Sequence, residues 1–188
     1  MADITLSSGD SIRPYRTPWG NFPIIGMALS TGISSATIRV GQVVVLDVGS
    51  TSYTNCIIPA ALSSGTVTST AIVGIAAENP GALSSTNTQG TVIPVWDANP
   101  HVEYRARTRG ALLNSTLVGQ VKNIAWDSTL TINLIDVGAG ALTTALPRVI
   151  ITSLLDNSGD SGGAVTFKFI TRDPGTSTTG SGCLAFYK

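Results

Sequence analysis

The residues best suited to catalytic chemistry lie in the run Gly-Asp-Ser-Gly-Gly at positions 159–163. The chain has a single histidine, His101, and Asp127 and Asp136 lie between it and Ser161. In this order the three residue types can form a triad, in which the imidazole removes the hydroxyl proton and the carboxylate orients the imidazole. The chemistry to consider is therefore acyl transfer at Ser161.

The same run spells the GDSGG signature around the nucleophile of chymotrypsin-like serine proteases, but its surroundings disagree with that function. His101 follows Asn99-Pro100 and lacks the small-residue and cysteine context usual in those proteases. Gly163 is followed by Ala-Val, where the proteases usually have Pro-Leu. Because a triad is recognised by its geometry, five letters cannot establish one. A chymotrypsin-like serine protease is kept as an alternative function.

A β-hairpin explains more of the residues around this run. Residues 149–155 and 164–170 are rich in β-branched and aromatic side chains, and all eight residues between them favour turns. The turn is a poor calcium loop, because Ser161 stands where an EF-hand needs glycine and Phe167 where it needs glutamate. We therefore predict a structural hairpin here. No catalytic residue, metal ligand or cofactor is assigned, and we expect a protein that is not an enzyme.

Short apolar runs separated by turn residues continue along the chain, and no segment shows a 3.6-residue period over three turns. This pattern predicts an all-β fold, a barrel or a sandwich. In residues 102–109, alternation places Glu103, Arg105, Arg107 and Arg109 on one face of a strand and Val102, Tyr104, Ala106 and Thr108 on the other. The arginine row is either a solvated outer face or a docking surface for carboxylates of a partner.

The composition limits the class of partner. Only 12% of the 188 residues are charged, and the formal net charge is zero. A nucleic-acid or anionic-membrane binder would need a basic surplus, so neither is expected as a partner. A surface with so little charge suggests burial in an assembly. The start of the chain lacks the pattern of a secretory signal, so Cys56 and Cys183 are expected to be small buried residues rather than a disulfide.

Both ends of the chain are predicted to be extended arms. Residues 12–23 contain three prolines, two arginines and three aromatic residues, so residues 1–23 form an arm that either wraps its own domain or reaches a neighbouring subunit. We expect the arm to be removable without loss of the fold. At the other end, residues 173–188 join a Gly/Ser/Thr-rich linker to an apolar tip, which would dock on its own domain or on another chain. The candidate partner-binding residues of the arm are Arg13, Tyr15, Arg16, Trp19 and Phe22.

Several strands resemble those of the head decoration, or cement, proteins of tailed bacteriophages. The resemblance lies in residues 41–47 (GQVVVLD), 72–78 (IVGIAAE), 90–96 (GTVIPVW) and the 156–169 hairpin, and it covers roughly residues 40–172. It implies a protein without catalytic residues that binds the outside of a capsid lattice, often as a trimer at local threefold positions. Such proteins clamp neighbouring capsid subunits against the pressure of the packaged DNA.

The resemblance sets the remaining expectations. Compact decoration proteins are often shorter than this chain, which suggests two β-lobes, near residues 24–100 and 101–172, between the two arms. The implied partner is the major capsid protein, the implied oligomer is a homotrimer, and the implied location is the virion exterior after synthesis in the host cytoplasm. Arg105, Arg107 and Arg109 are secondary candidates for the partner surface. A tail or fibre component remains a further alternative.

Overall fold

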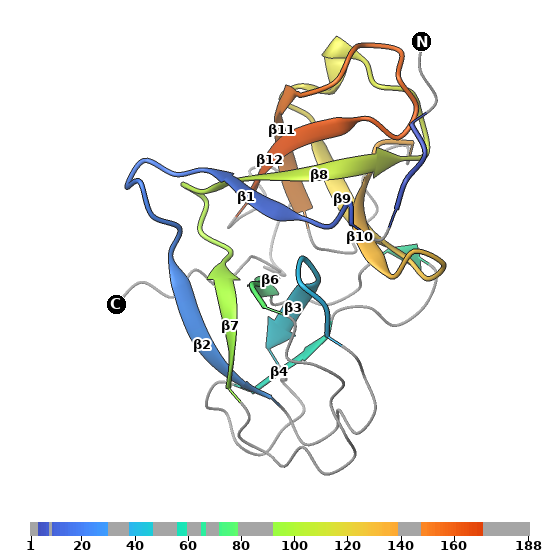
Figure 1. The fold of residues 1–188 in the computed structure, drawn as a ribbon. Helices are drawn as coiled ribbons and strands as arrows, with labels where there is room; N and C mark the ends of the chain where they lie inside the picture. Colours follow the sequence, from blue (N-terminus) through green and yellow to red (C-terminus); the bar gives the residue numbers. More distant parts are fainter. Residues whose placement is uncertain are drawn as a thin grey trace, which may run out of the picture.

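The computed structural model describes residues 4–7, 9–29, 38–46, 56–59, 65–66, 72–78, 92–138 and 148–170. In this part of the chain the secondary structure consists of β-strands and one short 3-10 helix, η1 (Ser115–Leu117), so the all-β prediction is confirmed. Two lobes lie one above the other, as Figure 1 shows. Among the described residues there is no helix long and apolar enough to cross a membrane.

The first lobe is a closed barrel in which the strands follow the order β2-β4-β3-β6-β7. Only the β2–β4 pair is parallel, and the other neighbours are antiparallel. The members of this barrel are β2 (Ile24–Leu29), β3 (Val43–Leu46), β4 (Cys56–Pro59), β6 (Ile72–Ala76) and β7 (Val92–Asp97).

The second lobe has the order β8-β10-β9-β11-β12, and pairing of β12 with β8 closes the ring. Here too only the first and third strands, β8 and β10, are parallel. Two strands from elsewhere join this lobe: β1 (Arg13–Arg16) pairs with β8, and β5 (Gly65–Thr66) pairs with β9. The lobe's own strands are β8 (Glu103–Arg109), β9 (Val121–Asp127), β10 (Ile132–Asp136), β11 (Arg148–Leu154) and β12 (Ala164–Phe169).

The two lobes therefore share one topology. In each ring the first strand lies between the third and the fifth, and the second lies between the third and the fourth. A short sequence marks the same place in both, because Val-Gly-Gln-Val occurs at 40–43 and at 118–121, just before or at the start of the second strand. Its glycine adopts a positive φ in each copy, 84° at Gly41 and 83° at Gly119, as the third residue of a type II turn requires.

Equivalent hydrogen bonds confirm that the two turns correspond. Gly41 N donates to Ala76 O at 2.9 Å, and Gly119 N donates to Ile151 O at 2.8 Å. Each acceptor residue lies on the fourth strand of its lobe and also donates from its own N–H to the carbonyl of the glutamine that follows the glycine. These bonds join Ala76 N to Gln42 O at 2.8 Å and Ile151 N to Gln120 O at 3.1 Å. The molecule is thus a tandem repeat of one five-stranded unit.

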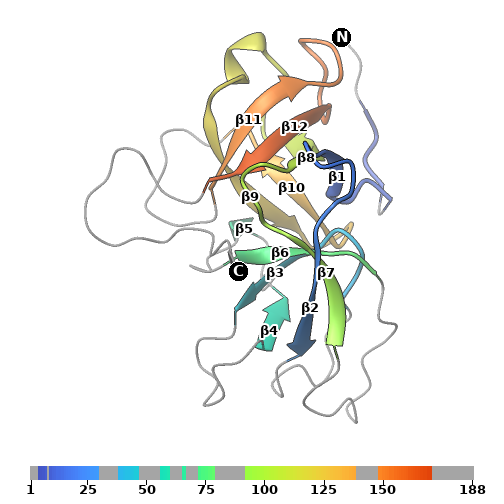
Figure 2. The ribbon, with the colours of Figure 1, turned by 90° about the vertical axis from the view of Figure 1, so that its left-hand side faces the viewer.

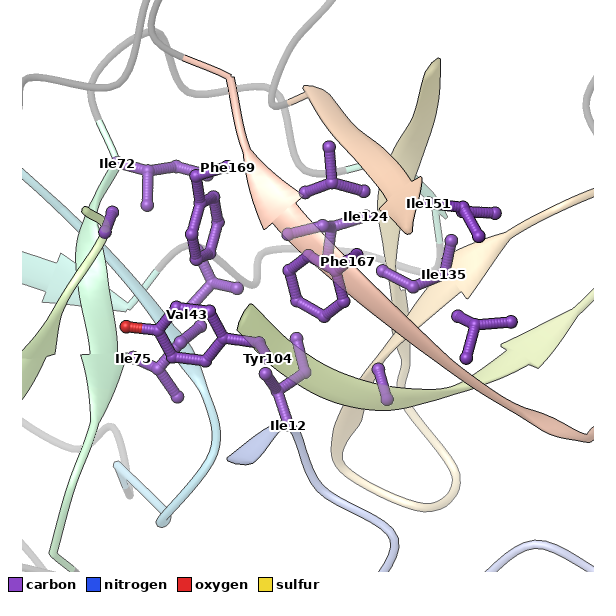
Figure 3. Packing of buried hydrophobic residues seen from close by; sticks show 14 of the residues in the cluster. Ile12, Val43, Ile72, Ile75, Tyr104, Ile124, Ile135, Ile151, Phe167 and Phe169 are labelled. Carbon is purple, nitrogen blue, oxygen red and sulfur yellow. The ribbon is translucent and has the colours of Figure 1, made fainter. Parts of the chain in front are cut away.

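A shared apolar core joins the lobes. Val43 and Val45 of β3 belong to the same buried cluster as Tyr104 and Phe167 of the second lobe, whereas Val44 packs inside the first barrel. Both faces of β3 are therefore buried, which is why its sequence is a continuous apolar run rather than an alternating one. Figure 3 shows the rings of this cluster between strands of the two lobes.

Aromatic packing and one buried side-chain amide connect the two lobes. The ring centroids of Tyr104 and Phe169 are 5.2 Å apart in an edge-on contact, and the Tyr104 hydroxyl donates to Asp97 O at 2.5 Å. The fully buried Asn133 accepts a hydrogen bond at Oδ1 from Val43 N at 2.9 Å and donates from Nδ2 to Ala125 O at 3.4 Å. Apolar burial and polar contacts thus run from one lobe to the other.

Candidate functional site

The serine-protease triad is not formed. His101 lies in the turn before β8, whereas Ser161 forms a bridge with Leu112 beyond the other end of that strand. The seven residues of β8 span about 20 Å, which separates the imidazole from the hydroxyl. The His101 side chain instead makes an edge-on contact with Trp19 at 6.0 Å between ring centroids. Asp127 accepts hydrogen bonds from the backbone of the turn that follows it.

The Gly-Asp-Ser-Gly-Gly run is the turn of a hairpin, as the sequence predicts. Strands β11 and β12 pair antiparallel on either side of it, and Gly159 and Gly162 have φ values of 99° and 67°. The carbonyl of Asp160 accepts from Leu113 N at 2.9 Å, and the carbonyl of Ser161 accepts from Ile4 N at 3.1 Å. Within the described ranges no group of three His, Cys, Asp or Glu residues is arranged to hold a metal ion.

The N-terminal arm packs against its own molecule. Ile12 is fully buried in the shared core, and β1 pairs antiparallel with β8, with Arg13 opposite Arg105. This packing agrees with the interpretation in which the arm wraps its own domain. The sequence led us to expect that residues 1–23 can be removed without loss of the fold, but removal would open the core at Ile12 and uncover the edge of β8, so truncation is now expected to destabilise the fold.

Four of the five candidate residues on the arm are exposed. Tyr15 is 43% exposed and Trp19 is 56% exposed, and the Arg16 guanidinium lies 5.9 Å from the centroid of the Tyr15 ring. Arg13 is exposed as well. Phe22 differs from these, because it is half-buried and packs against the shared core. It therefore supports the fold, and the exposed surface consists of the other four residues.

The predicted alternation along β8 is confirmed, since Tyr104, Ala106 and Thr108 are buried and the residues between them are not. The three arginines differ in their contacts, however. Arg107 Nε lies 3.0 Å from Asp10 Oδ1, and its Nη1 lies 2.6 Å from Asp156 Oδ2. These two ion pairs fasten the arm and the β11–β12 turn to β8, so Arg107 is engaged within the molecule.

We call the two ion pairs of Arg107 the Arg107 clamp, and the pKa of Asp10 reflects its place in it. Burial alone would raise the pKa of Asp10, but hydrogen bonds from Arg107 and from Ser7 outweigh it and hold the pKa below its ordinary value. Sequence reasoning missed both acidic partners of Arg107. They are 97 and 49 residues away in the chain, and no local pattern marks them.

Arg109 is also engaged, whereas Arg105 faces solvent. Arg109 Nη1 donates to Trp126 O at 3.2 Å, and its Nη2 lies 3.5 Å from Asp136 Oδ2. Arg105 is exposed, and no carboxylate among the described residues lies within 4.0 Å of Arg105 or of Arg13. Because these two residues are directly opposite in the β1–β8 ladder, their Cβ atoms are about 5 Å apart and their like charges repel.

We call the exposed residues along β1, the loop after it and the adjacent part of β8 the β1 surface. Beside it is a depression of about 190 Å³, lined in part by Asp10, Arg105, Arg107 and Asp156. The β1 surface is basic and aromatic, and it is the strongest candidate binding site in the described part of the chain. It consists of Arg13, Tyr15, Arg16, Trp19 and Arg105.

A comparison of the chain with protein-family models, with curated proteins and with solved structures found no match. The residues 173–188 that were predicted to form a C-terminal arm, including Cys183, lie outside the described residues.

Proposed function

We propose that this chain is a structural protein of a bacteriophage virion that binds the outer surface of the capsid and stabilises its lattice. The partner is the major capsid protein, and the oligomer on the lattice is a trimer, as the resemblance to decoration proteins suggests. The observation that carries the proposal is the pair Arg13 and Arg105, two like charges held side by side on an exposed surface that also carries the exposed Tyr15 and Trp19.

The arginine pair favours an acidic partner. Like charges directly opposite in a ladder destabilise it by up to about 1 kcal/mol, and a carboxylate bound between them would remove this repulsion. Guanidinium groups recognise carboxylates through two parallel hydrogen bonds, which gives orientation as well as attraction. Acidic side chains on the capsid surface are therefore the expected contacts of Arg13 and Arg105.

The aromatic residues of the β1 surface supply apolar contact area. Tyrosine and tryptophan dominate many interfaces because they bury a large area with few rotatable bonds. Tyr15 lies on β1, which is held by the β8 ladder, and Trp19 packs edge-on against His101, so little ordering is needed when a partner binds. A preformed surface of this kind suits a clamp that must hold several subunits at once.

Binding to capsid heads tests the proposal. Heads assembled without this protein are mixed with the wild-type chain, with Arg105→Ser or with Trp19→Ala, and bound protein is measured after sedimentation. We expect at least a tenfold loss of affinity for both variants. Arg39→Ser, which removes an exposed charge from the first lobe, is the matched control and should bind normally. Equal binding of all four proteins would exclude the β1 surface as the contact.

Two alternatives have their own tests. A tail or fibre component would use the same surface, and immunogold labelling of virions would then place the protein on the tail rather than on the head. The protease alternative requires Ser161 to act as a nucleophile, which its distance from His101 disfavours.

A further inference from the structure

A β-bulge in the second lobe brings three hydroxyl groups together. From Ile151 to Ser153 the strand β11 advances by two residues while its partner β12 advances by one. Thr152 and Ser153 therefore both lie opposite Thr166. Thr152 Oγ1 and Ser153 Oγ lie 2.7 and 2.6 Å from Thr166 Oγ1. Bulges often redirect side chains beside a functional site, and this one directs two hydroxyls at a third.

The number of hydrogens in this cluster leaves one donor over. Each hydroxyl carries one hydrogen, and the three hydroxyls share two hydrogen bonds. Thr166 is fully buried, and within the described structure its side chain has only these two partners, so its hydrogen goes to one of them. That partner keeps its own hydrogen. Thr152 and Ser153 are both half-buried, so the remaining O–H can donate to a group at the surface of the sheet.

Two arginines continue the cluster across the sheet. Thr166 stands opposite Arg105 in the β12–β8 ladder, and Arg105 stands opposite Arg13 in the β1–β8 ladder. Residues directly opposite in such ladders share one face, with Cβ atoms about 5 Å apart. Figure 2 shows β11, β12, β8 and β1 side by side in the second lobe. We call these five residues the hydroxyl–arginine row: Thr152, Ser153, Thr166, Arg105 and Arg13.

The acidic groups near this row are directed to other arginines. Asp10 and Asp156 both bind Arg107. Glu103 stands opposite Arg16 in the β1–β8 ladder. Among the described residues, no carboxylate lies within 4.0 Å of either arginine of the row. The two guanidinium groups therefore present two positive charges beside the spare hydroxyl donor.

Space for a bound ion adjoins the row. Arg105 also lines the depression of about 190 Å³, together with Ser11 and Ala164. Ala164 lies two residues before Thr166 on β12 and hence on the same face of the strand. The depression is several times larger than the roughly 30 Å³ that a water molecule occupies in the liquid. It can therefore hold a small ion with part of its hydration shell.

We propose that the hydroxyl–arginine row binds a free tetrahedral oxyanion, phosphate or sulfate, as a doubly charged ion. The two guanidinium groups match its charge, and the spare hydroxyl supplies a further charge-assisted hydrogen bond. A single carboxylate, with one charge and two oxygens, would satisfy fewer of these donors. The ion would compete with the proposed capsid contact for Arg13 and Arg105, but its binding does not require a capsid.

Titration of the full-length chain with inorganic phosphate tests the inference. Amide NMR shifts are followed at constant ionic strength, maintained with chloride, and sulfate and acetate are titrated in the same way. We expect saturable shifts at Arg13, Arg105 and Ser153 with phosphate and with sulfate, and binding of acetate that is weaker by about fivefold or more. Arg105→Ser should weaken phosphate binding by about tenfold, as loss of a charge-assisted hydrogen bond predicts. Arg39→Ser, which removes an exposed charge from the first lobe, should bind phosphate normally.

A variant without the hydroxyls separates the row from a simple pair of arginines. Thr152→Val/Ser153→Ala/Thr166→Val removes the whole cluster and keeps both arginines. Replacing mutually bonded polar groups by apolar groups of similar shape costs little stability, and an unchanged Tm would verify this. Phosphate binding should weaken by about threefold or more. Capsid binding through Arg13 and Arg105 should remain, so the oxyanion site and the proposed function can fail separately.

Three results would overturn the inference. The first is the absence of saturable shifts when phosphate is added to the wild type. The second is equal affinity for phosphate and acetate, which would mean that the row does not distinguish a doubly charged ion. The third is normal phosphate binding by the variant without hydroxyls, which would leave only general attraction to the arginines. None of these measurements involves capsids.

Discussion

Asn133 provides the sharpest test of the contact between the lobes. Its side chain is fully buried, and Oδ1 accepts the only hydrogen bond found for Val43 N in the described structure outside the strand ladders. Asn133→Ala would leave that buried N–H without a partner, which costs about 1–3 kcal/mol. The small cavity adds about 1 kcal/mol. We therefore expect the free energy of unfolding to fall by about 3 kcal/mol, with a decrease in Tm of about 6–12 °C for a chain of this size.

A neighbouring asparagine supplies the matched control. Asn123 lies on the adjacent strand β9 and is also buried, but its Oδ1 has no hydrogen-bond partner in the described structure. Asn123→Ala removes an unsatisfied acceptor, so only the small cavity remains as a cost, about 1 kcal/mol. Urea denaturation followed by tryptophan fluorescence and by circular dichroism would measure both variants. If Asn133→Ala were as mild as Asn123→Ala, the amide bond between the lobes would contribute nothing, and the reasoning would fail.

Three further predictions follow from single residues. Burial raises the pKa of Asp97 above its ordinary value, so the contribution of Asp97 to stability should be greatest below the unfolded pKa and should decrease as the pH rises through the folded pKa. Asp97→Asn should abolish this decrease in denaturation measured from pH 3 to 7. Gly119→Ala should lower the free energy of unfolding by about 1–2 kcal/mol through its positive φ alone, whereas Gly41→Ala should lower it by more, because its Cβ would lie 2.4 Å from Ser11 Cβ. Differential scanning calorimetry would compare the two glycine variants, and equal losses would contradict the role of Ser11. Ser161→Ala should leave capsid binding and any proteolysis of a casein substrate unchanged, and a selective loss of proteolysis would revive the protease alternative.

The fold class and the 156–163 turn could be predicted because their signals are local. Alternating burial along β8 follows from the period of a strand, and the turn follows from eight consecutive turn-forming residues. The repeat was harder to detect, because many apolar sequences fit the same strand positions. Only the turn that begins the second strand requires a particular residue, a glycine with positive φ, and there the sequence Val-Gly-Gln-Val recurs.

The candidate site was predictable in composition but not in arrangement. The prolines, arginines and aromatic residues of the arm suit an arm folded on its own lobe as well as one that reaches another chain, so composition could not decide between them. The roles of the β8 arginines also depended on distant residues. Asp10 and Asp156 neutralise Arg107, while Arg105 is paired across the ladder with Arg13.

The burial of Ile12 has a consequence for folding during translation. Ile12 is synthesised well before Tyr104 and Phe167, which belong to the same buried core cluster. The first barrel is synthesised before the second lobe, so the residues of β3 and β6 that belong to the shared core remain uncovered until β12 has been synthesised. Until then the nascent chain exposes apolar surface, which makes it prone to aggregation. We expect ribosome-associated chaperones to bind the nascent chain during translation. Translation stalled before β12 should yield an insoluble product.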